Sequence, residues 1–201
     1  MLDDKEVRTE NEIEIKAILI GESGVGKTSL INVCIGNPFN EGEKPTISNT
    51  FAKKIFEINS KKYIIDLWDT AGQERYRNMA KIFYKDAHIV IFVYDITNEN
   101  SFNSLKDYWI KEVEEYLGDM PICGIVGNKK DLYFDESVKE ATVKEYADSK
   151  NIKYKIVSAK NEPDGFNEFI KELLKDSKPF EVSLEKIKLE NINIKKSKCK
   201  C

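Results

Sequence analysis

The first residues able to do chemistry form a glycine-rich loop at 21–28, with the sequence Gly-Glu-Ser-Gly-Val-Gly-Lys-Thr. This is the spacing G-x-x-x-x-G-K-[ST], in which glycines let backbone amides wrap a phosphate group. We expect Lys27 to neutralise the β- and γ-phosphates and the Thr28 hydroxyl to bind Mg²⁺. The predicted phosphate-binding residues are Gly21, Glu22, Ser23, Gly24, Val25, Gly26, Lys27, Thr28 and Ser29.

A second stretch, 69–74, reads Asp-Thr-Ala-Gly-Gln-Glu and follows about 40 residues later. An aspartate at the end of a strand can hold Mg²⁺ through a water molecule, which is the role expected of Asp69. Gly72 lets its amide approach a γ-phosphate, and Gln73 then stands where it can orient an attacking water. Together with the loop at 21–28, this stretch predicts hydrolysis of a nucleoside triphosphate.

The choice of base is predicted from two short loops, 128–131 and 158–160. The Asp131 carboxylate accepts two donors, which matches the N1–H and 2-amino group of guanine, whereas adenine would leave a buried carboxylate unpaired at a cost of about 1–3 kcal/mol. Lys129 can lay its stem along the face of the base, and the Ala159 amide can donate to guanine O6. The predicted guanine site comprises Asn128, Lys129, Asp131, Ser158, Ala159 and Lys160.

The elements that must position these loops alternate between strands and helices. Apolar runs predict strands at 16–20, 89–94, 122–126 and 152–157, and a hairpin of 49–58 with 61–68. Helical spacing covers 28–37, 99–117 and a stretch to residue 150 that a Ser137–Glu140 capping box would open. The closing helix carries an apolar stripe of Phe166, Phe169, Ile170, Leu173 and Leu174. The alternation predicts an α/β protein whose mostly parallel sheet is covered on both faces.

The composition excludes several classes of protein. A net charge of −3 from 32 basic and 35 acidic residues gives no basic excess, so nucleic acid is not expected as a partner. Cys34 and Cys123 lie in apolar runs and are expected to be buried thiols in a reducing, cytosolic setting. The first residues lack a secretory signal, and no apolar run approaches the length of a membrane helix. Any membrane attachment is therefore expected to be covalent or through a partner.

Taken together, these motifs resemble the Ras superfamily of small GTPases, and most closely the Rab family. The similarity covers 13–177 and the C-terminal cysteines, and it is carried by 68–77, 83–87 and 93–98. The resemblance implies a P-loop NTPase-type sheet of six strands, one of them an antiparallel edge strand, with five helices on both faces. The GTPase domain is thus expected at 13–177. The polar, aperiodic residues on either side predict a flexible extension at 1–12 and a flexible tail at 178–201.

The resemblance also assigns roles by position. Thr46 matches the switch I threonine that closes on Mg²⁺ and the γ-phosphate, and Phe39 matches the aromatic residue that packs against the base. The apolar triad that effectors contact in this family corresponds to Phe51, Trp68 and Phe83. Between these features the chain departs from the family, with Ile-Ser-Asn-Thr-Phe at 47–51 where Ile-Gly-Val-Asp-Phe is usual. This departure bears on the choice of effectors and leaves the nucleotide chemistry unchanged.

The arginine content predicts the rate of hydrolysis. An arginine finger contributes about 10³–10⁵ in rate when it reaches the transition state. No arginine lies between Arg8 and Arg75, so the segment around Thr46 supplies none. We therefore expect slow intrinsic hydrolysis that a GTPase-activating protein accelerates.

The C-terminal tail predicts lipidation. The last eleven residues hold four lysines and no acidic residue, and they end in Cys199-Lys200-Cys201. This is not a C-a-a-X box, but it resembles the double-cysteine ending of Rab proteins, which is geranylgeranylated on both thiols. Two lipid chains anchor stably, and each nearby lysine adds about 1 kcal/mol at an anionic leaflet.

The sequence thus predicts a Mg²⁺-dependent switch that binds GTP and GDP and regulates vesicle traffic. The resemblance implies effectors, an exchange factor, an activating protein, prenylation machinery and a GDP-dissociation inhibitor, with a monomer anchored by lipid on the cytosolic face of an endomembrane. One alternative is a GTP-locked binding scaffold without significant hydrolysis. The presence of Gln73 and Thr46 disfavours this alternative. Another is an adenine-specific P-loop phosphotransferase, which Asp131 disfavours.

Overall fold

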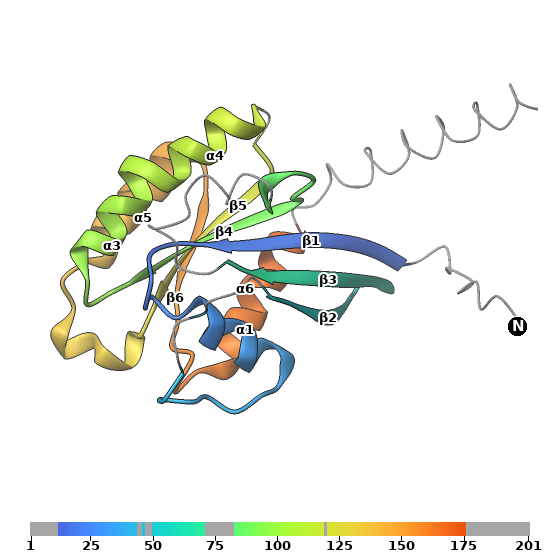
Figure 1. Cartoon of the computed structure of the whole chain (residues 1–201), viewed down its shortest axis with the longest axis horizontal. Coiled ribbons are helices and arrows are strands. Elements are labelled where there is room, and N and C mark those ends of the chain that lie inside the picture. The colour runs from blue at the N-terminus through green and yellow to red at the C-terminus, as the bar shows by residue number, and fades with distance from the viewer. Residues whose placement is uncertain (1–11, 44–45, 47–49, 71–82, 119, 176–201) are drawn as a thin grey trace, which may run out of the picture.

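The protein is built around a six-stranded sheet (Figure 1). The computed structural model describes residues 12–43, 46, 50–70, 83–118 and 120–175. The strand order is β2-β3-β1-β4-β5-β6, and every neighbouring pair is parallel except the edge pair β2–β3. This confirms the predicted fold class. The strands are β1 (Glu12–Ile20), β2 (Thr50–Ile58), β3 (Lys61–Asp69), β4 (Ile89–Asp95), β5 (Ile122–Asn128) and β6 (Lys153–Ile156).

Helices cover both faces of the sheet. In Figure 1, α1 and α6 lie against one face, while α3, α4 and α5 lie on the other. A π-helical turn, Leu105–Trp109, joins α3 to α4 without a break in the helix. The described residues contain five α-helical segments: α1 (Lys27–Ile35), α3 (Glu99–Ser104), α4 (Ile110–Leu117), α5 (Glu140–Lys150) and α6 (Pro163–Lys175).

The core consists of two apolar layers, one on each side of the sheet. The first layer contains side chains of α1 and α6, among them the whole predicted stripe of the closing helix. The second layer lies under α3, α4 and α5. All seven residues of β4 are buried, because a central parallel strand has helices on both faces. The core therefore fixes the ends of the central strands, from which the loops of the predicted site emerge.

Two expectations about element boundaries are wrong. Strand β1 begins at Glu12 instead of residue 16, because Glu12 pairs with Lys62 of β3, and their side chains form an ion pair at 2.6 Å. The capping box at Ser137 does not form, since helix α5 begins at Glu140. Instead, the Ser137 amide and hydroxyl both donate to the carbonyl of Ile96, at 2.9 and 3.3 Å.

The two cysteines of the described residues are free thiols within the fold. Cys34 is buried in α1, whereas Cys123 in β5 is partly buried and donates to the Pro121 carbonyl at 3.3 Å. Burial raises the pKa of each thiol to about 12. Within the described part of the chain, no helix is both long and apolar enough to cross a membrane.

Candidate functional site

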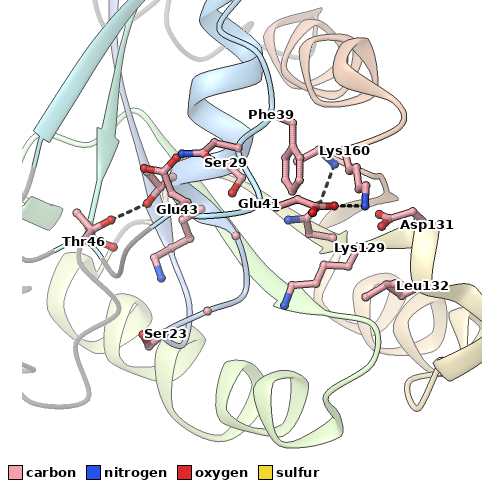
Figure 2. A pocket seen from close by; sticks show the side chains of 18 residues that line it. Ser23, Ser29, Phe39, Glu41, Glu43, Thr46, Lys129, Asp131, Leu132 and Lys160 are labelled. Carbon is pink, nitrogen blue, oxygen red and sulfur yellow. Dashed lines mark hydrogen bonds and ion pairs between the residues drawn. The ribbon is translucent and has the colours of Figure 1, made fainter.

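One elongated cavity brings the predicted loops together (Figure 2). It has a volume of about 380 Å³ and lies where β1, β5 and β6 end, which is the usual ligand position in an open α/β sheet. Thr46 lies at one end, and Asp131 and Leu132 lie at the other (Figure 2). Its lining residues are Ser23, Gly24, Gly26, Lys27, Thr28, Ser29, Phe39, Asn40, Glu41, Glu43, Thr46, Thr70, Asn128, Lys129, Asp131, Leu132, Ala159 and Lys160.

The end of the cavity at 21–28 has the geometry of an anion site. Lys27 is only 5% exposed, and its ammonium donates to the carbonyls of Gly21 and Glu22, both at 2.8 Å. Helix α1 begins at Lys27 with no side-chain cap and no acidic residue in its first turn. The loop amides and the positive end of the helix dipole are therefore available to a phosphate group.

Position 26 requires glycine, both for its backbone conformation and for the space left by its neighbours. Its φ of +94° is in the left-handed region, and a Cβ there would lie 2.3 Å from Nδ2 of Asn128. No other residue type fits this position without a shift of the Asn128 side chain.

Three oxygen-bearing side chains meet beside this anion site. The Thr28 hydroxyl lies 2.6 Å from the Thr46 hydroxyl and donates to Oδ2 of Asp69 at 2.7 Å, while Thr46 donates to the same oxygen at 3.3 Å. Asp69 is 2% exposed, and its Oδ1 is buried without a hydrogen-bond partner. Burial raises the pKa of Asp69, and the Thr28 hydroxyl and the Lys27 charge oppose this shift. Two hydroxyls and a carboxylate with an unpaired oxygen form a donor set that fits Mg²⁺.

At the other end, the predicted base-binding side chains are tied to one another. The Asp131 carboxylate accepts a hydrogen bond from the Ser158 hydroxyl at 2.5 Å. Lys129 has a left-handed backbone, with φ of +67°, and its ammonium lies 2.6 Å from Oδ2 of the buried Asp95. These contacts hold Asp131 and Lys129 at the cavity wall, where a carboxylate and an aliphatic stem are available to a planar base.

Asn128 connects the two ends of the cavity. It is 2% exposed; its Nδ2 donates to the Val25 carbonyl at 3.0 Å, and its Oδ1 accepts from the Ala159 amide at 3.2 Å. Sequence reasoning placed Asn128 on the base and aimed the Ala159 amide at guanine O6. In this structure the Ala159 amide donates to the Asn128 side chain. Asn128 thereby connects the phosphate loop to the loop after β6 through hydrogen bonds.

Five lining residues were missed by the sequence analysis. Lys160 and the exposed Glu41 form an ion pair across the open side of the cavity, beside Phe39 (Figure 2). Glu41 carried no motif that could have indicated this contact, because its partner lies 119 residues away. The missed residues are Asn40, Glu41, Glu43, Thr70 and Leu132.

Other predicted residues lie beside the cavity or outside the described residues. The side chains of Phe51, Trp68 and Phe83 are in contact, with ring centroids 5.4 Å apart for the first pair and 5.9 Å for the second. Phe51 is 59% exposed, so the predicted triad reaches the surface. Gly21, Glu22, Val25, Asp69 and Ser158 do not line the cavity but contact residues that do. Gly72, Gln73, Cys199 and Cys201 lie outside the described residues.

Comparison with known proteins identifies the family. The model of the Ras family matches residues 16–178. The chain belongs to the Ras family. Its members are GTPases that hydrolyse GTP, and several relatives of this chain are named as Rab proteins.

Three relatives illustrate the extent of the match. The chain is 42% identical over 153 residues to Ras-related protein Rab-21 of Geodia cydonium, covering 76% of this chain and 66% of that protein. It is 39% identical over 146 residues to GTP-binding protein ypt1 of Schizosaccharomyces pombe, covering 73% and 71%. It is also 39% identical over 145 residues to Ras-related protein Rab-30 of Homo sapiens, covering 72% and 71%.

Proposed function

We propose that this Ras-family protein is a Rab-type switch that binds GTP and GDP with Mg²⁺ and hydrolyses GTP slowly. The observation that carries the proposal is one continuous cavity, which joins the anion site around Lys27 to the Asp131 carboxylate. A guanine nucleotide has complementary groups at both ends, namely a charged phosphate chain and a base with two adjacent donors. The GTPase domain is proposed to span 13–177.

Different residues of the chain are proposed to bind the phosphates, the base and Mg²⁺. Lys27 and the loop amides hold the phosphates, and Asp131 selects the base. Thr28, Thr46 and Asp69 would hold Mg²⁺, Asp69 through water; the ion, when bound, neutralises charge on the phosphate oxygens. Thr46 reaches Thr28 from a separate loop, so its position is proposed to depend on the γ-phosphate.

Hydrolysis and the membrane cycle are further parts of the proposal. Gln73 is proposed to orient the attacking water, and Gly72 to donate to the γ-phosphate. Lipidation of Cys199 and Cys201 would anchor the protein on the cytosolic face of an endomembrane. There it would regulate vesicle traffic through effectors, with an exchange factor, an activating protein, prenylation machinery and a GDP-dissociation inhibitor as further partners.

Binding and single-turnover hydrolysis by purified protein test this proposal. Calorimetric titration in Mg²⁺ should give binding to GTP and GDP and none of comparable strength to ATP. Phosphate release without a partner should be slower than about 10⁻² s⁻¹, and Gln73→Leu should slow it further. Equal rates for both proteins would favour a GTP-locked scaffold, and ATP binding as tight as GTP binding would favour an adenine-specific phosphotransferase.

A further inference from the structure

The phosphate loop carries an acidic side chain, Glu22. Its backbone carbonyl accepts from the Lys27 ammonium at 2.8 Å, so Glu22 lies next to the group that would neutralise the phosphates. A carboxylate that turned toward a bound polyphosphate would repel it. The Glu22 side chain is not part of the cavity lining.

A buried indole holds the Glu22 side chain outside the cavity. Nε1 of Trp109 donates to Oε1 of Glu22 at 3.2 Å, although the two residues are 87 positions apart. Trp109 is 3% exposed. The contact thus fixes a charged group of the loop to the long helix that covers the sheet.

An unusual helical turn places Trp109 in this position. Leu105–Trp109 is π-helical, and the Ile110 amide donates to the Leu105 carbonyl five residues earlier. A π-turn contains more residues than an α-turn and therefore changes where the following side chains point around the helix. Such turns are found mostly as single turns within α-helices, frequently at functional sites.

Neighbouring aromatic residues fix the indole further. The ring of Tyr108 packs edge-on against Trp109, with centroids 4.9 Å apart. The Tyr108 hydroxyl donates to Glu112 at 2.9 Å, and the Tyr84 hydroxyl donates to the other carboxylate oxygen at 2.8 Å. The donor that reaches Glu22 is therefore part of a fixed polar and aromatic cluster.

We propose that Trp109 is a positioning residue for nucleotide retention. Its indole N–H holds the Glu22 carboxylate away from the phosphate end of the cavity and so slows nucleotide release. The inference rests on the proposed binding of GTP and GDP. Because the effect is electrostatic, it should grow with the charge of the phosphate chain.

Release kinetics of the full chain test this inference. Wild-type and variant proteins are loaded with fluorescent GTP or GDP in Mg²⁺, and release is followed after addition of excess unlabelled GDP. Trp109→Phe, which keeps an aromatic ring but removes the donor, should speed GTP release about tenfold, as expected for loss of one hydrogen bond to a charged group. GDP release should be accelerated less. Adding Glu22→Gln to this variant should restore release to within about twofold of the wild-type rate.

A second variant avoids any change in the helix. Glu22→Ala removes the charge and leaves Trp109 intact, so GTP release should become about twofold slower than in the wild type. Ile110→Val is the matched packing control, because it shortens a fully buried side chain next to Trp109 and keeps the indole donor to Glu22. Its release rates should equal those of the wild type.

Several results would overturn the inference. Acceleration by Glu22→Ala would mean that the contact is only a structural tie between loop and helix. Unchanged release in Trp109→Phe, equal acceleration for both nucleotides, or failure of Glu22→Gln to restore slow release would also contradict it. If the wild-type protein bound neither nucleotide, the proposed function itself would be wrong, which is a different result from slow release that is insensitive to Trp109.

Discussion

The two ends of the cavity are built in different ways. At the phosphate end, Lys27 and Asp69 are nearly fully buried, and much of the binding surface is the backbone of one loop and the start of α1. At the base end, side chains come from three separate loops; Leu132 is 42% exposed, and the open side is bridged by the ion pair of Glu41 with Lys160. The first end is thus closed and local, whereas the second is open and assembled over long range.

This difference separates the determinants of affinity from those of selectivity. Removing one member of a buried charged cluster leaves its partners unsatisfied and is costly. An exposed ion pair is screened by solvent and contributes little. The phosphate end should therefore dominate affinity, while the base end should decide which nucleotide binds.

The largest effect is expected from Lys27→Ala at the phosphate end. The variant removes a buried ammonium that would make charge-assisted hydrogen bonds with the phosphates, so GTP affinity should fall about 10³-fold. Calorimetric titration in Mg²⁺ measures the change, with the exposed Lys144→Ala on α5 as the control. A titration curve identical to that of the wild type would contradict the expectation that the phosphate end dominates affinity.

The next largest effect is expected from Asp131→Asn at the base end. Replacing an acceptor by a donor mismatches guanine, so GTP affinity should fall about 10- to 100-fold, corresponding to one unsatisfied polar pair. Xanthine nucleotide, in which a carbonyl acceptor replaces the 2-amino donor of guanine, should bind better than GTP because the Asn amide can donate to that carbonyl. Competition between the two nucleotides for the variant measures this, and an unchanged preference would refute the role of Asp131.

Asn128→Ala tests the connection between the two ends. It removes the hydrogen bonds from Nδ2 to the Val25 carbonyl and from the Ala159 amide to Oδ1. Nucleotide release should be about 30-fold faster, since each of the two lost bonds is worth about 1 kcal/mol. Stopped-flow release after a chase measures the rate, and the exposed Asn161→Ala is the control. If only thermal stability falls and release is unchanged, Asn128 supports the fold without coupling the two ends.

The smallest effect is expected from the exposed pair at the base end. Glu41→Gln removes the charge that faces Lys160 and should accelerate release about twofold at low ionic strength. The difference should disappear at about 1 M salt, where the Debye length is about 3 Å. The exchanged pair Glu41→Lys with Lys160→Glu should restore the wild-type rate. An effect that persists in high salt would contradict an exposed electrostatic contact.

The same contrast explains what the sequence could predict. The loop at 21–28 and its helix are neighbours in the chain, so their spacing alone indicated the phosphate end. The roles of Asn128 and Glu41 depend on contacts across more than 100 residues, which local patterns do not contain.

Some predicted element boundaries are wrong for a similar reason, because contacts distant in the sequence set them. The Ser137 hydroxyl is bonded to Ile96 instead of capping α5. The π-turn at Leu105–Trp109 lies within a stretch whose apolar spacing fits an ordinary helix, so periodicity could not indicate it.

The ionisation of the two internal cysteines has a practical consequence for chemical labelling. With pKa values of about 12, Cys34 and Cys123 are protonated at neutral pH, and only the thiolate reacts readily with alkylating reagents. A maleimide dye at pH 7 should therefore discriminate strongly against both sites in the native protein.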